Sequence, residues 1–376
     1  MSDHRNLLMR WQLAAGLACL AASCVDPSPP RTRAARDAVI YGEDSRLDVY
    51  AVDDPAIAQM TVASTVAFMS AEHLVPIGGG AIAIAADTLA ASNNLCPDQA
   101  FASQPAAAAC SGVLIDDQLV LTAGHCVSED ATCDDQQLVF GYAITARTGA
   151  IAIADDAIYR CKSVPLRRHG VDADGRRWDV GFIELDRPVG AERRPVAIAG
   201  EAPPLGSGVV VIGYPSGLPA KVDAGAGLLS ARPCMDYFTI DSDTFQSSSG
   251  SGVFDEHGRL VGIFARGGSD YAFDAERGCA VARRVEVADP ADAEQASYVG
   301  PAIAALCATG WPSSRLCAAG APVSDTSTSC AADAPTGCAA GGSRLAVIGL
   351  LAALVAIARP RRRGRRRSPE ETTWAR

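Results

Sequence analysis

One segment, CSGVLIDDQLVLTAGHCV at residues 110–127, restricts the possible folds of this chain more than any other. Its two apolar runs are joined by Asp116 and Asp117, a pattern typical of antiparallel strands connected by a tight turn. Cys110 and Cys126 flank the pair and could be bridged across neighbouring strands. The segment ends in Ala-Gly-His-Cys, which leaves His125 just beyond the second strand.

Short β-type runs recur from residue 39 to about residue 306, separated by Gly, Pro and Asp. Examples are QLVFGYAI, DVGFIELD, GVVVIGYP and GVFDEHGRLVGIFA. Their spacing predicts an all-β sandwich or barrel and not alternating βα units. One helix is expected near the end of this region, in YVGPAIAALCATG at residues 298–310.

A lone histidine is more often a surface or core residue than a catalyst, but the setting of His125 changes that interpretation. The cysteine-flanked hairpin followed by Ala-Gly-His-Cys resembles the histidine motif of trypsin-like (chymotrypsin-fold) serine peptidases. This resemblance implies an all-β fold of two antiparallel β-barrels with a short C-terminal helix. It also implies that His125 is the general base of an acyl-transfer reaction.

A catalytic histidine needs a group that orients its ring, and Asp179 in RRWDVGFIELDRPV is the candidate. An acidic residue directly before an apolar strand is placed to be buried, and a buried carboxylate needs a partner. The alternative is an aspartate that only starts the strand. The segment resembles the aspartate motif of the same family, and it lies between the histidine and serine segments.

The stretch TFQSSSGSGVF, residues 244–254, has the composition of a linker, yet the resemblance places the nucleophile there. Ser249 is the candidate, because Gly250 follows it and a strand begins four residues on. The backbone N–H groups of Ser247 and Ser249 would form the oxyanion hole. The family has glycine where Ser247 stands and proline where Gly252 stands, so an inactive homologue that binds a partner remains the alternative function.

The wider sequence indicates a branch of the family. AVIYGEDSRLDVY, RPVAIAG and GYPSGLPAKV resemble bacterial relatives of the glutamyl endopeptidases, and the resemblance covers about residues 39–306. Trypsin has an aspartate just before the nucleophile, where this chain has Ser248, so the activation switch of trypsin is missing.

Four residues are candidates for the specificity pocket: Asp243, Phe264, Arg266 and Gly267. Phe264 stands where glutamyl endopeptidases have a histidine, which argues against strict cleavage after glutamate. Asp243 lies six residues before Ser249, where trypsins hold the aspartate that selects Arg or Lys. The favoured interpretation is that Asp243 only caps its loop. Arg266 would favour acidic or small substrates if it projected into the cleft.

Thirteen cysteines suggest an oxidising compartment. Cys133 with Cys161 is a plausible second bridge, and Cys234 with Cys279 a weaker third. The acidic residues Glu129, Asp130, Asp134 and Asp135 are expected to be solvated turns, and no metal or cofactor is expected. A net charge of −10, with seven arginines confined to residues 359–367, argues against nucleic acid as a partner and leaves a protein or peptide substrate.

The two ends of the chain predict export to a bacterial cell surface. Residues 1–24 resemble a signal peptide, and LAASC resembles a lipobox that would lipidate Cys24, with ordinary cleavage as the alternative. Residues 25–38 are expected to be a pro-segment or spacer, and 307–344 a linker. The Gly-Cys pair that ends at Cys338 resembles the motif of myxobacterial sorting signals. It precedes the apolar segment 345–358, about 21 Å long as a helix, and the basic tail 359–376, so anchoring at the outer membrane is predicted.

Overall fold

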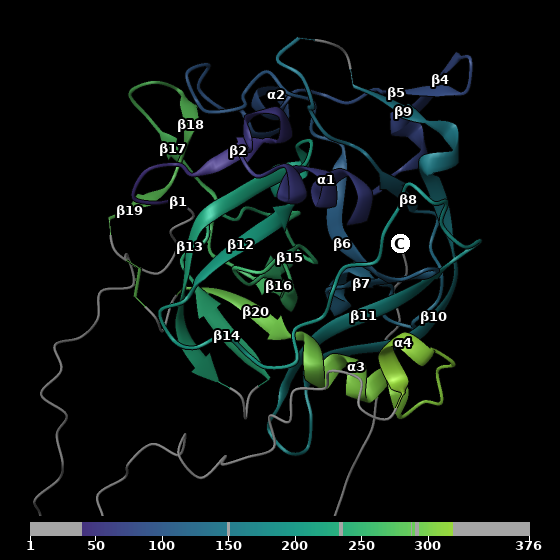
Figure 1. Ribbon diagram of the computed structural model, residues 1–376. Coiled ribbons are helices and arrows are strands. Elements are labelled where there is room, and N and C mark those ends of the chain that lie inside the picture. The colour runs from purple at the N-terminus through teal and green to yellow at the C-terminus, as the bar shows by residue number, and fades with distance from the viewer. Residues whose placement is uncertain (1–39, 149–150, 233–235, 287, 290–292, 319–376) are drawn as a thin grey trace, which may run out of the picture. The chain divides into compact units, whose positions relative to one another are not determined.

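The computed structural model describes residues 40–148, 151–232, 236–286, 288–289 and 293–318, and two antiparallel β-barrels dominate this part (Figure 1). The first barrel closes in the order β10-β11-β7-β6-β3-β8. Its strands are β3 (Thr65–Met69), β6 (Ala108–Asp116), β7 (Leu119–Thr122), β8 (Gln137–Phe140), β10 (Ile158–Val171) and β11 (Arg177–Leu185). The hairpin expected in residues 110–127 is therefore confirmed as β6 and β7.

The second barrel closes through the pairing of β12 with both β13 and β15, and β2 (Arg46–Asp48) extends it at β13. Its order is β12-β15-β16-β20-β14-β13. These strands are β12 (Gly208–Gly213), β13 (Lys221–Arg232), β14 (Tyr237–Ile240), β15 (Gly252–Phe254), β16 (Leu260–Arg266) and β20 (Glu294–Tyr298). The expected double antiparallel β-barrel is confirmed.

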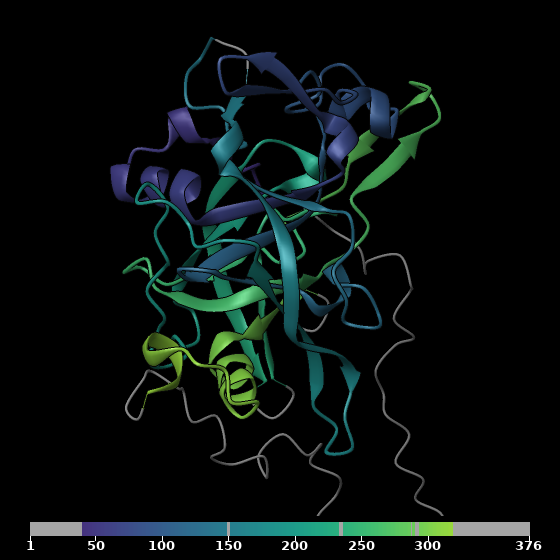
Figure 2. The same cartoon turned by 90° about the vertical axis from the view of Figure 1, so that its right-hand side faces the viewer.

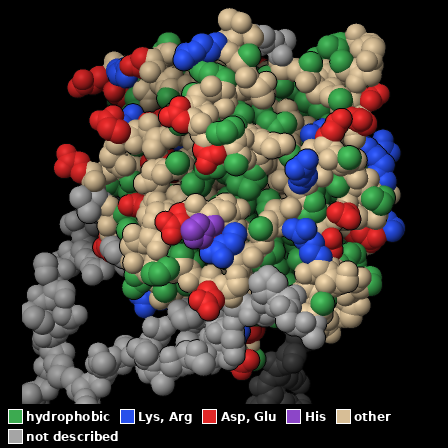
Figure 3. All heavy atoms as spheres, in the orientation of Figure 1, with side chains coloured by type: hydrophobic (Ala, Val, Ile, Leu, Met, Phe, Trp, Pro, Cys, Tyr) green, Lys and Arg blue, Asp and Glu red, His purple; other side chains and the backbone are tan. Residues whose placement is uncertain are grey.

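Smaller sheets lie outside the barrels. A parallel pair joins β1 (Ile40–Tyr41) to β19 (Arg284–Val285), and a hairpin joins β17 (Tyr271–Asp274) to β18 (Cys279–Ala282). A third sheet contains β4 (Leu74–Gly78), β5 (Ala81–Ile84) and β9 (Ala152–Ala154). On the face shown in Figure 3, both acidic and basic side chains lie among hydrophobic ones, so neither positive nor negative charge covers this whole face.

The apolar alternation of the strands fills three main cores. Side chains of successive strand residues point to opposite faces, and β7 uses both faces. Val120 packs in the core inside the first barrel, whereas Leu119 and Leu121 pack in the core shared with the second barrel and the C-terminal helix. A further core fills the second barrel around Phe238. The hydrophobic residues of these strands thus fill each barrel and also pack the two barrels against each other.

In the described residues four α-helices accompany the strands: α1 (Pro55–Ser64), α2 (Leu89–Asn93), α3 (Val299–Cys307) and α4 (Ser314–Cys317). The helix expected near the end of the domain is α3. Figures 1 and 2 show α3 and α4 together at one end of the barrels. No helix within the described ranges is long and apolar enough to cross a membrane.

Four disulfides lie in the described residues: Cys96–Cys279, Cys110–Cys126, Cys133–Cys161 and Cys307–Cys317. The expected bridge between Cys234 and Cys279 is wrong, because Cys279 bonds to Cys96 across 183 residues of sequence. Cys234 itself falls outside the described residues. Cys110–Cys126 ties the start of β6 to the turn that carries His125.

The folded region continues beyond the predicted boundary at residue 306. Leu316 in α4 is 2% exposed and packs in the shared core, and Cys307–Cys317 fixes α4 to the end of α3. The first residues of the expected linker 307–344 therefore belong to the domain. Residues 1–24, 25–38, 345–358 and 359–376, with Cys24 and Cys338, lie outside the described part of the chain.

Candidate active site

His125 and Asp179 form the best-defined contact of the candidate site. His125 lies in a short 3-10 turn, η4 (Gly124–Cys126), directly after β7, and Asp179 lies in β11. A side chain on Gly124 would meet the Arg168 carbonyl oxygen at 2.5 Å and the Val180 nitrogen at 2.9 Å. The glycine before His125 therefore lets the turn pack against the neighbouring backbone.

Asp179 holds both the backbone and the ring of His125. Its Oδ1 atom accepts a hydrogen bond from the His125 backbone N–H at 3.0 Å, and its Oδ2 atom lies 3.0 Å from Nδ1. The aspartate side chain is 1% exposed and the histidine side chain 35%. Burial raises the pKa of Asp179, but the hydrogen bonds and charge of His125 and the charge of Arg266 outweigh it, so this pKa lies below its usual value.

Arg266 also contacts this pair, at the end of β16. Its Nη2 atom lies 3.3 Å from Asp179 Oδ2 and donates to the Trp178 carbonyl oxygen at 3.4 Å. The sequence placed Arg266 among the pocket residues, but its guanidinium is paired with the candidate catalytic aspartate. Asp179 therefore faces two cationic or potentially cationic groups, Arg266 and His125.

The loop that carries Ser249 is shaped by close backbone contacts. Ser248 N–H donates to the Phe245 carbonyl oxygen at 2.9 Å, and Ser251 N–H donates to that of Ser248 at 2.7 Å. Gly250 has φ +88°, and a side chain there would collide with the backbone of Ser111. Only glycine suits this position, because it combines a left-handed backbone with a contact that leaves no room for a Cβ atom.

The same loop lies against the first barrel. The Ser249 carbonyl oxygen accepts from Ser111 N–H at 2.7 Å and lies 3.6 Å from Cys126 Sγ, the residue after His125. The structure thus brings the backbone of Ser249 beside the histidine turn. In the part of the chain that the structure describes, no hydrogen bond joins Ser249 Oγ to His125. Such contacts often tighten only when substrate binds.

Ser247 adopts the backbone conformation that glycine usually supplies. Its φ is +65°, in the left-handed region. Its carbonyl oxygen accepts from Ser111 Oγ at 2.9 Å, and that hydroxyl accepts from Tyr214 N–H at 3.0 Å. Among the described residues, the N–H groups of Ser247 and Ser249 make no hydrogen bond, which leaves both available to a ligand. The loop therefore offers two unused donors on either side of Ser248.

The remaining pocket candidates have structural partners. Asp243 accepts from Tyr41 N–H at 2.9 Å, from Ser45 N–H at 2.7 Å and from Ser45 Oγ at 2.9 Å. Burial, and then the charge of Asp223, raises the pKa of Asp243 to about 6. Phe264 is 3% exposed, and its carbonyl oxygen accepts from Gly250 N–H at 2.8 Å.

Gly267 is exposed and lies directly over the carboxyl group of Glu294, a residue that sequence reasoning missed. The segment of Glu294, EQASY, has no apolar pattern from which the burial of the glutamate could be predicted. Ser111 was also missed. Its position next to Cys110 gives no sign that its hydroxyl and N–H would organise the serine loop.

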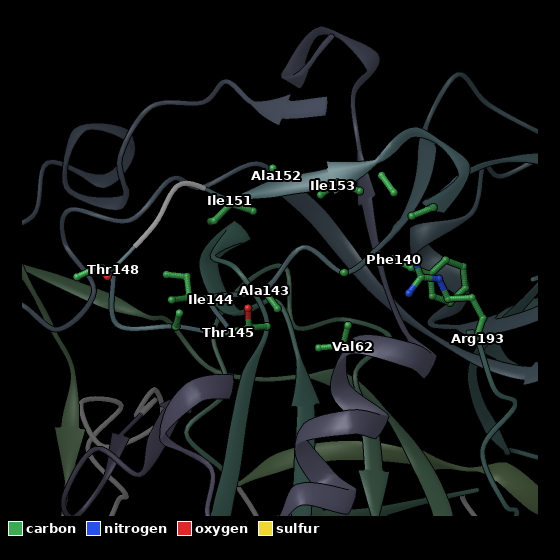
Figure 4. Close-up of a pocket in the computed structure, with 14 residues that line it drawn as sticks. Val62, Phe140, Ala143, Ile144, Thr145, Thr148, Ile151, Ala152, Ile153 and Arg193 are labelled. Carbon is green, nitrogen blue, oxygen red and sulfur yellow. The ribbon is translucent and has the colours of Figure 1, made fainter. Parts of the chain in front are cut away.

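Two places in the described residues resemble ligand sites. His125, His169 and Asp179 have ligand atoms within 4.8 Å of one another, a set able to hold a transition metal ion. The Arg266 charge on Asp179 opposes a cation there. A cavity of about 280 Å³ between α1, β8 and β9 is lined by Val62, Phe140 and Arg193 among others (Figure 4). It contains no candidate catalytic residue.

Two comparisons with known proteins found similarities to this chain. Residues 110–263 match a family model described as "Trypsin-like peptidase domain". A solved structure of a Glu endopeptidase in complex with MPD is similar, at 16% sequence identity and a TM-score of 0.41. That match covers 72% of this chain and 99% of the other.

Proposed function

We propose that this protein, which carries a trypsin-like peptidase domain and is a serine peptidase, is an endopeptidase that uses His125, Asp179 and Ser249. The observation that carries the proposal is the buried Asp179 carboxylate bound to both the backbone N–H and Nδ1 of His125. Such an arrangement fixes the tautomer in which Nε2 is free to accept a proton.

In the proposed reaction Ser249 Oγ attacks the scissile carbonyl carbon while His125 Nε2 takes the hydroxyl proton. The electron pair of the carbonyl moves to its oxygen, and the N–H groups of Ser247 and Ser249 would stabilise the resulting oxyanion. The protonated His125 then gives its proton to the leaving amine, and an acyl-enzyme remains on Ser249. Water, deprotonated by His125, hydrolyses this ester and restores the serine.

A fluorophosphonate probe tests this proposal. Labelling of the wild-type protein that Ser249→Ala abolishes and Ser251→Ala retains would support the nucleophile assignment. Absence of labelling in folded protein, with the segment before residue 40 removed as well as present, would contradict it. That result would favour the alternative, a peptidase homologue that binds a partner without cleaving it, for which Ser247 and the missing Ser249–His125 hydrogen bond are the supporting observations.

Export and surface anchoring belong to the same proposal. The four disulfides of the described residues favour an oxidising compartment. The signal-like residues 1–24, a lipid on Cys24 and the segments around Cys338 and 345–358 would supply export and attachment. Fractionation of cells that express the full chain, Cys24→Ala and a chain ending at residue 318 tests this. Membrane association that neither change reduces would contradict both anchors.

A further inference from the structure

The carboxyl group of Glu294 is buried beneath the surface with an unused oxygen. Glu294 begins β20 and is 1% exposed, and no described residue hydrogen-bonds its Oε2 atom. Its Oε1 atom accepts only a long hydrogen bond, 3.4 Å, from Gly268 N–H. Burying a carboxyl oxygen without a hydrogen-bond partner lowers the stability of the folded protein, and such atoms are rare in native proteins.

This carboxyl group lies between the two segments that border the candidate nucleophile. Glu294 Oε2 occupies the place where a side chain on Gly267 would begin, and Gly267 is exposed, so backbone alone covers the carboxyl there. On the other side lies Thr244, five residues before Ser249. Its buried hydroxyl lies near enough to Glu294 to lower the pKa of that carboxyl by hydrogen bonding, although the contact is not a well-formed hydrogen bond. Two polar atoms without a well-formed hydrogen bond therefore lie near each other in the described part of the chain, and one of them is five residues before Ser249.

Further negative charge surrounds the same place. Asp270 accepts a hydrogen bond from the N–H of Gln246, the residue before Ser247, at 2.8 Å. Burial raises the pKa of Glu294 well above its usual value, and the charges of Asp270 and Asp243 add to this. Arg46 also acts on Asp270. Its guanidinium is held by both oxygens of Asp44, at 2.8 Å each, so it leaves the local charge negative.

We propose that Glu294, with Thr244 and Asp270 beside it, receives the positively charged side chain of a lysine or arginine residue immediately before the scissile bond. The proposal rests on the proposed peptidase function. A substrate ammonium or guanidinium group would supply the donors that Glu294 Oε2 lacks and would compensate the surrounding carboxylates. Asp243 is not the recognising residue, because the backbone and side chain of residues 41–45 occupy its oxygens.

The experiment measures kcat/KM for fluorogenic peptides that differ only in the residue before the cleaved bond: lysine, arginine, leucine or glutamate. We expect lysine and arginine to be preferred over leucine and glutamate. Glu294→Gln should lower kcat/KM for lysine and arginine peptides by about 10- to 100-fold, the range for a hydrogen bond to a charged group. The leucine peptide should change by less than about 3-fold on the same scale. Glu276→Gln, an exposed glutamate on the β17–β18 hairpin, is the matched control and should change neither.

A binding measurement separates this inference from the proposed function. Benzamidine, a small mimic of the arginine side chain, should bind Ser249→Ala protein and lose about 10-fold or more in affinity when Glu294→Gln is added. Thr244→Val serves as a second variant with the same expected direction. If the wild-type protein cleaves none of the peptides and still binds benzamidine in a way that depends on Glu294, that result would support the cation site and refute only the catalytic proposal. Equal cleavage of all four peptides, a preference for glutamate, or benzamidine binding unaffected by Glu294→Gln would overturn the inference.

Discussion

Replacing Ser247 by glycine should stabilise the protein and preserve its activity. Ser247 has φ +65°, and a residue with a Cβ atom loses about 1–2 kcal/mol in the left-handed region. Glycine removes that penalty but loses about 0.5–1 kcal/mol more conformational entropy on folding. The Ser247 side chain itself makes no hydrogen bond in the described residues. We therefore expect a net gain of about 0.5–1 kcal/mol in the free energy of unfolding.

Thermal unfolding measures this gain, best in a Ser249→Ala background that prevents self-digestion. For a domain of this size the expected rise in Tm is about 1–4 °C. Ser248→Gly is the matched control, one residue along the same loop. Ser248 lacks a positive φ, is 2% exposed, and its Oγ atom accepts from Phe245 N–H at 3.2 Å. That variant should lose about 1–2 kcal/mol, from the hydrogen bond and the added chain entropy.

The activity of Ser247→Gly, measured with Ser249 intact, gives the second half of the test. Because the left-handed backbone is already present, kcat should stay within about 3-fold of the wild type, well below the loss seen when an oxyanion donor is removed. A lower Tm in Ser247→Gly, or equal destabilisation in both glycine variants, would refute the strain argument. A large rise in kcat would show that serine holds the loop away from its working conformation.

Three further outcomes are expected. Arg266→Gln should move the acid limb of the kcat/KM profile to higher pH, because it removes a charge that lies 3.3 Å from Asp179 and lowers the pKa of that carboxyl. Arg266→Lys should restore the wild-type limb, and a uniform loss at every pH would contradict this role. Burial raises the pKa of Asp270 to about 6 from 3.8, so the folded protein binds its proton more tightly and stability should fall as pH rises between these values. In denaturant titrations, Asp270→Asn should reduce the difference in stability between pH 4 and pH 7 and raise the free energy of unfolding at pH 7 by about 1–3 kcal/mol. An unchanged pH dependence would contradict the raised pKa of Asp270. Replacing Cys307 and Cys317 by alanine should cost about 2–3 kcal/mol in the same titrations, because the bridge closes a short loop that holds α4 on the core, and an unchanged denaturation midpoint would show that α4 contributes little.

The parts of the structure that local sequence patterns determine could be predicted. Period-2 apolar runs and turn residues identified β6, β7 and the other long strands, and the double barrel followed from the family resemblance of the His125 segment. The contact between His125 and Asp179 was predicted in the same way, from a resemblance that spans both motifs. Each of these inferences used residues close together in sequence or a pattern that the family shares.

Interactions that depend on the path of the chain through space could not be predicted. The Cys96–Cys279 bridge joins residues 183 positions apart, and cysteine connectivity cannot be deduced from spacing alone. Arg266 and Glu294 have no local signal, because their partners come from β11 and from the segments beside Gly267. The domain boundary was placed too early, because residues 307–318 are rich in small and polar residues, although Leu316 packs in the core.

The hydrogen bonds between Asp243 and residues 41–45 have a consequence for how the protein becomes active after synthesis. They join parts of the chain about 200 residues apart, the first residues of the described domain and the loop before Ser249. Contacts of such long range form late and make folding slow. Since Asp243 begins the loop that leads to Ser249, these contacts can hold that loop only after the chain from residue 41 to Ser249 has been made and its two ends brought together. A partly synthesised chain would therefore lack the loop conformation on which the proposed peptidase activity depends.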